Sequence, residues 1–263
     1  MKQLPGRAMR RLFRPASARI TRLLFNWARR DRERFVRQLF FDTIVGFVDD
    51  CRIEGDYLEF GCAQGSSLID MFDSMRPYPR QQTTRFLIFD SFEGLPEPTG
   101  HDAGVHRRYE GGQFACDIDQ YERNVRAGGV DMQRVKLIPG WYDQSLNESL
   151  KRELAIDKAS IVLIDCDLYE STVPVLDFIT SYIQDGTVLI FDDWFSYKGR
   201  LDQGEAKAFG EWLDAHPSIR ATEYQKSGRT MISFIMHVDD ESTPARSDPP
   251  VVTSGGERFR HQS

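Results

Sequence analysis

The chain has 263 residues and a formal net charge of -6 at pH 7, so it is long enough for one α/β domain with terminal extensions and too acidic overall for general nucleic-acid binding. Its four cysteines, at positions 51, 62, 116 and 166, show no CxxC spacing. We therefore expect free thiols and a cytoplasmic location, and no zinc site or disulfide framework.

Positive charge is concentrated at the N-terminus. Residues 1–37 hold twelve Lys or Arg against two acids, about +10, which leaves about -16 for the rest of the chain. Within residues 1–30, apolar side chains such as Leu23, Leu24 and Trp27 recur between arginines at roughly helical spacing. This basic arm has three interpretations: a solvated leader, a helix on an anionic membrane surface, or an arm that packs on the partner in a homodimer. No apolar run approaches the roughly 20 residues of a membrane-spanning helix, and no secretory signal is apparent.

The periodic elements of the domain occupy residues 31–238. Val36, Phe40, Ile44 and Phe47 or Val48 recur every three to four residues, which predicts a helix over 31–50 with one buried stripe. Residues 239–263 are polar and rich in Pro and Ser, which is typical of a disordered tail.

A glycine-rich turn follows the first predicted strand, residues 57–60, and leads into a helix that ends near residue 76. A dinucleotide fingerprint, G-x-G-x-x-G, would need glycine where Ala63 and Ser66 stand. A nucleoside without a diphosphate makes no such demand and remains allowed. The missing glycines, and the absence of a Tyr-x-x-x-Lys pair after the fourth strand, argue against a nicotinamide-dependent sugar oxidoreductase.

Two further strands end in residues suited to bind a nucleoside. The second strand, 86–89, ends at Asp90, which either accepts hydrogen bonds from ribose hydroxyls or serves as a turn residue. About thirty residues rich in Gly and Pro follow, a length typical of a lid, a binding loop or a disordered segment. The third strand, 135–138, leads to Trp141, an aromatic residue that either flanks a purine ring or belongs to the core.

Four acids follow the next two strands. Residues 161–164 and 187–191 are short apolar runs typical of strands buried on both faces of a parallel sheet. Because the carboxyl ends of parallel strands meet at one edge, we expect four acids to converge there: Asp165, Asp167, Asp192 and Asp193. Carboxylates in a partly desolvated crevice repel one another unless a cation offsets their charge, so the cluster predicts Mg2+ or a related ion. The alternative is that each Asp is a cap or turn residue.

The remaining elements complete the sheet. A crossover helix is expected between the two strands, with Ser171 or Thr172 as its N-cap and Gly186 just past its end. A helix over 204–216 and two strands, 221–225 and 230–237, follow.

Six segments together resemble a known family: EFGCAQG, FDSFEGLPEP, GGQF, GWYDQSL, IDCDLYESTVPVL and FDDW. They resemble the S-adenosylmethionine-dependent O-methyltransferases of the macrocin and mycinamicin type, which act on sugars of antibiotics and related glycosides. The resemblance covers about residues 56–237. It implies an α/β class I methyltransferase (Rossmann-like) fold, a seven-stranded doubly wound sheet with an antiparallel last strand. Residues 31–238 would be the S-adenosylmethionine-dependent methyltransferase domain.

The resemblance also implies roles for individual residues. S-adenosylmethionine would lie over Glu59, Gly61, Gly65, Asp90 and Ser91, with Trp141 beside it. Mg2+ would sit on Asp165, Asp192 and Asp193, whose spacing also resembles that of the metal-binding acids of catechol O-methyltransferase. Catechol-type enzymes place a lysine three residues after the first of these acids, where this chain has Leu168, so a small-molecule glycoside hydroxyl is the expected acceptor. Asp167 is our hypothesis for the base that takes its proton.

A non-catalytic binding module that acts through the basic arm is the remaining alternative. The four intact acids disfavour it, because a site without chemistry has no need of clustered charge.

Overall fold

The computed structural model describes residues 14–104, 109–239 and 251–252, with side chains described from residue 32 to residue 239. Most of the predicted tail, 240–250 and 253–263, and the first part of the basic arm, 1–13, lie outside the described residues. Within the described part of the chain, no helix is long and apolar enough to cross a membrane.

A single mixed sheet runs through the middle of the fold, in the strand order β3-β2-β1-β4-β5-β7-β6-β8. The first five strands are parallel, and β7 lies antiparallel between β5 and β6, which confirms the predicted seven-stranded sheet. A two-residue strand, β8, pairs with β6 and departs from the predicted disorder at those residues. The strands are β1 (Asp56–Phe60), β2 (Phe86–Asp90), β3 (Val135–Pro139), β4 (Ala159–Ile164), β5 (Val188–Phe191), β6 (Ile219–Ser227), β7 (Met231–Val238) and β8 (Val251–Val252).

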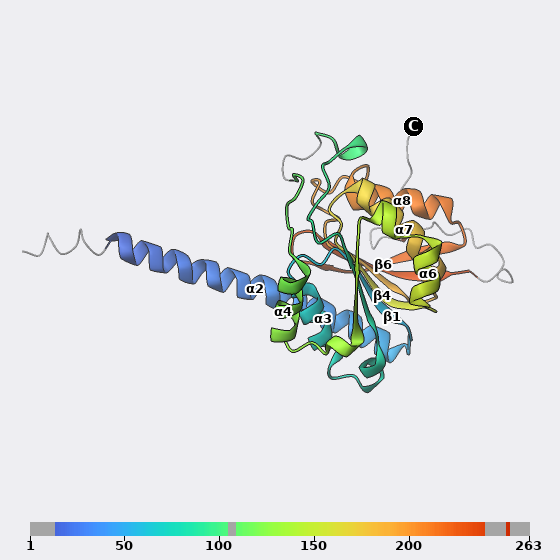
Figure 1. Cartoon of the computed structure of the whole chain (residues 1–263), viewed down its shortest axis with the longest axis horizontal. Helices are drawn as coiled ribbons and strands as arrows, with labels where there is room; N and C mark the ends of the chain where they lie inside the picture. Colours follow the sequence, from blue (N-terminus) through green and yellow to red (C-terminus); the bar gives the residue numbers. More distant parts are fainter. Residues whose placement is uncertain (1–13, 105–108, 240–250, 253–263) are drawn as a thin grey trace, which may run out of the picture.

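Helices cover both faces of the sheet (Figure 1). Because successive strand residues point to opposite faces, β4 contributes Val162 and Ile164 to one core and Ile161 and Leu163 to the other. The first core includes α6, α7 and α8, and the second includes α2, α3 and α4. The helices are α2 (Arg14–Asp50), α3 (Ser66–Met75), α4 (Ile118–Ala127), α5 (Tyr142–Ser145), α6 (Glu148–Leu154), α7 (Tyr169–Ile179) and α8 (Gly204–Ala215), with short 3-10 helices η1 (Pro79–Thr83), η2 (Gly100–Asp102), η3 (Met132–Arg134) and η4 (Thr180–Tyr182).

Helix α2 joins part of the basic arm to the predicted 31–50 helix in one element of 37 residues. Its C-terminal half packs on the sheet through Phe41, Ile44 and Val48, all fully buried, which confirms the predicted apolar stripe. Its N-terminal half projects away from the rest of the fold (Figure 1).

Helix α7 begins earlier than expected. The prediction of Ser171 or Thr172 as its N-cap is wrong, because α7 starts at Tyr169. Its first N–H groups are satisfied from a distant loop: the Asp102 carboxylate accepts from the backbone N–H of Tyr169 and of Glu170, both at 3.0 Å. A cap supplied from 67 residues away leaves no local sequence signal.

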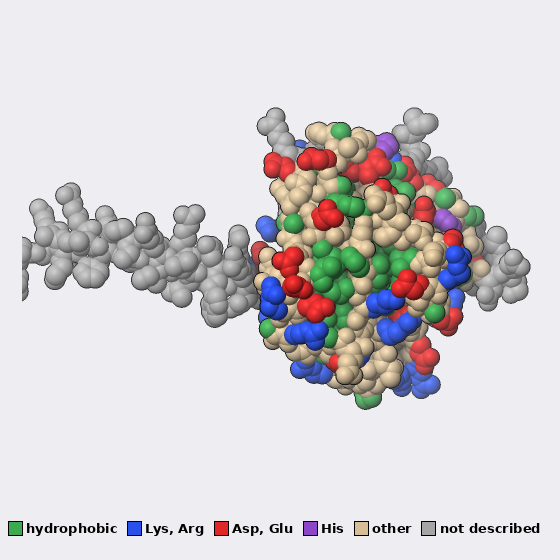
Figure 2. All heavy atoms as spheres, in the orientation of Figure 1, with side chains coloured by type: hydrophobic (Ala, Val, Ile, Leu, Met, Phe, Trp, Pro, Cys, Tyr) green, Lys and Arg blue, Asp and Glu red, His purple; other side chains and the backbone are tan. Residues whose placement is uncertain are grey.

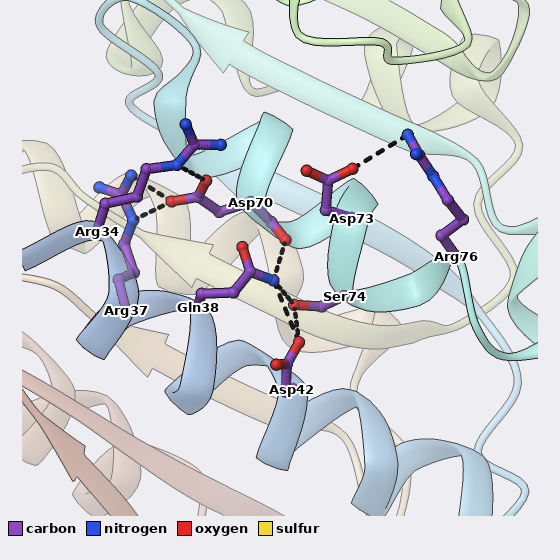
Figure 3. A network of polar contacts seen from close by, with 8 residues as sticks. All are labelled: Arg34, Arg37, Gln38, Asp42, Asp70, Asp73, Ser74 and Arg76. Carbon is purple, nitrogen blue, oxygen red and sulfur yellow. Dashed lines mark hydrogen bonds and ion pairs between the residues drawn. The ribbon is translucent and has the colours of Figure 1, made fainter. Parts of the chain in front are cut away.

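A polar network fastens α2 to α3, the helix that follows the glycine-rich turn (Figure 3). The buried Asp70 carboxylate of α3 accepts from Arg34 Nε at 2.9 Å and from Arg37 Nε and Nη2 at 2.9 and 2.6 Å. One turn further along α2, the Gln38 side-chain amide donates to Ser74 Oγ at 2.6 Å. The position of α3 therefore depends on α2.

We expect Asp70→Asn to lower the free energy of unfolding by about 1–3 kcal/mol, because the amide has one acceptor oxygen where two arginines donate. Urea denaturation measures the change. Asp73→Asn on the same helix is the control, since its pair with Arg76 is more exposed and should contribute no more than about 0.5 kcal/mol. Equal losses in the two variants would contradict a special role for Asp70.

Candidate active site

A cavity of about 700 Å³ opens at the carboxyl edge of the parallel strands. The segments that follow β1, β2, β3, β4 and β5 all contribute to its wall. The segment after β2 is the loop 91–117, of which 105–108 lie outside the described residues. The predicted convergence of the four acids at this edge is therefore confirmed, and the glycine-rich turn lines the same cavity. The lining includes Gly61, Cys62, Ala63, Asp90, Ser91, Trp141, Asp165, Asp167, Asp192 and Asp193.

The glycine-rich turn owes its path to two glycines with left-handed backbones. Gly61 has φ +86°, and a Cβ there would lie 1.9 Å from the Asp165 carbonyl oxygen. Only glycine therefore lets the ends of β1 and β4 approach so closely. Gly65, with φ +87°, is the N-cap of α3, and a Cβ there would lie 2.5 Å from Val125 Cγ2. Gly65 lies outside the cavity lining, so its part in cofactor binding would be to shape the turn.

Asp90 links this turn to the second strand. Its Oδ2 accepts from the Cys62 N–H and its Oδ1 from the Phe92 N–H, both at 2.7 Å. Each carboxylate oxygen has a second lone pair for a ligand. The neighbouring Ser91 hydroxyl donates to the Gly94 carbonyl at 3.0 Å and closes the start of the 91–117 loop.

Glu59 lies behind the cavity wall and not in it. Its carboxylate is fully buried and accepts from the Tyr57 hydroxyl at 2.8 Å and from Ser67 Oγ at 2.5 Å. Burial raises its pKa to about 7, although the two hydrogen bonds lower it. Glu59 therefore joins β1 to α3 beneath the turn, and its side chain does not line the cavity where the resemblance places a cofactor.

Three carboxylates gather at the ends of β4 and β5. Ligand oxygens of Asp165, Asp167 and Asp193 all lie within 4.8 Å of one another. Asp192 lines the same cavity without belonging to this group. The group therefore contains Asp167 at the place that Asp192 takes in the expected set of metal-binding acids.

A tight turn explains the position of Asp167. The Leu168 N–H donates to the Cys166 carbonyl at 2.6 Å, with Asp167 between them at φ +60°. A γ-turn with positive φ at a non-glycine residue is strained and needs support from its surroundings. Such a turn folds the chain back after Cys166 and brings Asp167 beside Asp165.

The electrostatics of this group fit a divalent cation. Burial, followed by repulsion from Asp192 and Asp193, raises the pKa of Asp165 well above its usual value. Burial and Asp193 likewise raise the pKa of Asp167. Among the described residues that line the cavity, none is Lys, Arg or His. Clustered carboxylate oxygens are the ligand type that Mg2+ prefers.

Charge is also unevenly distributed on the surface. On the face drawn in Figure 2, acidic side chains are prominent in the upper part, and Lys and Arg gather in the lower part.

The 91–117 loop reaches the acids through Tyr109, which sequence reasoning missed. The Tyr109 hydroxyl donates to Asp193 Oδ1 at 3.0 Å. Its ring is buried and packs with Leu168 and Tyr197. No motif marks Tyr109, because its partner lies 84 residues further along the chain.

Residues 32–206 match the macrocin-O-methyltransferase (TylF) family. The chain belongs to this family. It is 30% identical over 146 residues to the 8-demethyl-8-(2,3-dimethoxy-alpha-L-rhamnosyl)-tetracenomycin-C 4'-O-methyltransferase of Streptomyces olivaceus, covering 54% of each chain. It is 28% identical over 165 residues to the demethyldecarbamoylnovobiocin O-methyltransferase of Streptomyces niveus, covering 59% of this chain and 60% of that enzyme. The match thus spans little more than half the length of these relatives.

A solved structure shares the fold of this family member. The O-methyltransferase NovP superposes with a TM-score of 0.63 at 21% identity, covering 76% of this chain and 79% of that chain. This likeness confirms the predicted class of fold.

Glu59 gives a testable pH dependence. Its pKa is about 7 in the folded chain against an ordinary value of 4.5, so between these pH values only the folded chain keeps the proton. Its contribution to stability is complete below about pH 4.5 and is lost as the pH rises towards 7. The free energy of unfolding of the unmodified chain should therefore fall by about 3 kcal/mol over this window because of Glu59. We expect Glu59→Gln to lack this fall, as measured by urea denaturation at several pH values. Parallel profiles for the two proteins would contradict this.

Proposed function

We propose that this chain transfers the methyl group of S-adenosylmethionine to a sugar hydroxyl on a secondary-metabolite glycoside or a glycan intermediate, with assistance from Mg2+. The observation that carries the proposal is one cavity in which the glycine-rich turn, Asp90 and the acidic group meet. The names of the two curated relatives, both O-methyltransferases and one acting on a rhamnosyl group, support a glycoside acceptor.

The cofactor half of the cavity suits a nucleoside with a positively charged sulfur. S-adenosylmethionine, when bound, supplies a methyl group on a sulfonium. Gly61 and its neighbours would admit it close to the backbone, and Asp90 would accept hydrogen bonds from the ribose hydroxyls. Trp141 would flank the adenine, and Ser91 would hold the adjoining loop. Glu59 and Gly65 would keep this wall in place from behind.

The acceptor half contains the acids. Asp165 and Asp193 would hold Mg2+, with Asp192 beside them, and Mg2+ supplies Lewis acidity toward a hydroxyl. Asp167, buried next to both acids, would take the hydroxyl proton. A cavity closed by buried side chains such as Tyr109 would also exclude water from the transfer.

Three further points extend this proposal. We assign residues 31–238 to the catalytic domain, a cytoplasmic location to the chain, and a homodimer as its assembly. The basic arm of residues 1–30 would then pack on the partner subunit.

The first test is calorimetric titration with S-adenosylhomocysteine, in Mg2+ and then in EDTA, with NAD as the control ligand. We expect saturable binding of S-adenosylhomocysteine and none of NAD, because the turn lacks the glycines that a diphosphate requires. Absence of S-adenosylhomocysteine binding in both buffers would contradict the proposal and favour a binding module that acts through the basic arm.

The second test concerns the base. With a glycoside acceptor that supports turnover, we expect Asp167→Asn to reduce kcat by about 100-fold or more, because the amide cannot take the proton. Its affinity for S-adenosylhomocysteine should stay within about twofold of the original. Asp177→Asn, at an exposed position of α7, is the matched control and should turn over normally. Unimpaired turnover in Asp167→Asn would remove Asp167 from this role.

A further inference from the structure

One buried side chain connects the two loops that carry the acids. Glu205, in the first turn of α8, is fully buried. Its Oε1 accepts from the Cys166 N–H at 3.2 Å, and its Oε2 accepts from the Asp193 N–H at 2.9 Å. Cys166 lies between Asp165 and Asp167, so each oxygen of Glu205 holds one of the two acidic loops.

Tyr197 supports the same arrangement from the segment between β5 and α8. Its hydroxyl donates to the carbonyl oxygen of Asp167 at 3.0 Å. Asp167 is the strained residue of the γ-turn. Its ring lies against Gly204, where a Cβ would come within 2.3 Å of Tyr197 Cε2. Gly204 directly precedes Glu205. The Tyr197 hydroxyl and the Glu205 carboxylate therefore reach the Asp165–Asp167 loop from one short stretch of chain.

Charge alone argues against an acid at position 205. Glu205 adds a fifth carboxylate to a group of four, of which Asp167 and Asp193 are buried, and a buried like charge costs free energy unless hydrogen bonds compensate it. Both of its oxygens are used by backbone N–H groups of the acidic loops. The benefit of this residue therefore lies in the geometry that it imposes on those loops.

We infer that Glu205, assisted by Tyr197, is a positioning residue that sets the separation of the two acidic loops for a divalent cation. The inference rests on the proposed metal-assisted methyl transfer. Partners that orient metal-binding side chains typically change metal affinity by about 10- to 100-fold when they are replaced.

Two substitutions isolate the two contacts. In Glu205→Gln one backbone N–H keeps an acceptor, but the amide group meets the other N–H as a second donor, which pushes one loop away. Tyr197→Phe keeps the ring against Gly204 and loses only the bond to the Asp167 carbonyl. Glu211→Gln is the matched control, because Glu211 lies on the same helix and contacts Tyr169 and Lys207 at the surface.

The experiment measures Mn2+ binding to the full-length chain by electron paramagnetic resonance, with S-adenosylhomocysteine present. We expect the Kd for Mn2+ to rise by about tenfold or more in Glu205→Gln and by a smaller factor in Tyr197→Phe. It should be unchanged in Glu211→Gln. The affinity for S-adenosylhomocysteine, measured separately, should stay within about twofold in all three variants, which shows that the fold is intact.

Each outcome decides the matter. Original Mn2+ affinity in both Glu205→Gln and Tyr197→Phe would overturn the positioning role and leave the proposed metal site standing. Absence of Mn2+ binding in the unmodified chain, with S-adenosylhomocysteine still bound, would overturn the metal-assisted function and this inference with it. If Glu205→Gln does not fold, Tyr197→Phe decides: weaker Mn2+ binding supports the inference, and unchanged binding overturns it.

Discussion

Repulsion between closely spaced carboxylates is the constraint on which the cavity edge of this fold depends. Asp165, Asp167 and Asp193 bring oxygens within 4.8 Å of one another, and two like charges at that distance repel by about 3 kcal/mol at an effective dielectric constant of about 20. Hydrogen-bond donors reduce this cost at Asp193, whose Oδ1 accepts from the Tyr109 hydroxyl and from the Ser196 hydroxyl. A cation bound between these carboxylates would offset the repulsion that remains.

The opposite side of the cavity is held by a close strand contact and by hydrogen bonds. Gly61 permits close approach of two strands, and Asp90 fixes the turn by accepting from two backbone N–H groups. Glu59 joins β1 to α3 behind the turn, and Asp70 joins α3 to α2. This wall of the cavity is therefore supported through successive layers that end at helix α2, which includes part of the basic arm.

Sequence reasoning succeeded where the signal is local. Short apolar runs identified the strands, and the rule that parallel strands end at one edge brought Asp165 and Asp193 together. It failed where the partner is distant: Asp102 caps a helix 67 residues away, and Tyr109 reaches an acid 84 residues away. The γ-turn at Asp167 could not be predicted, because a positive φ at aspartate has no pattern in the sequence. The burial of Glu59 behind the cavity wall could not be predicted either, because its partner Ser67 lies eight residues further along the chain.

The described parts of the 91–117 loop contact both sides of the cavity. Asp102 caps α7, and Tyr109 donates to Asp193 Oδ1, which also accepts from the Ser196 hydroxyl. The start of the same loop belongs to the Asp90 turn, because the Phe92 N–H donates to Asp90 Oδ1. The conformation of this loop is therefore coupled to the acids at one end and to the glycine-rich turn at the other.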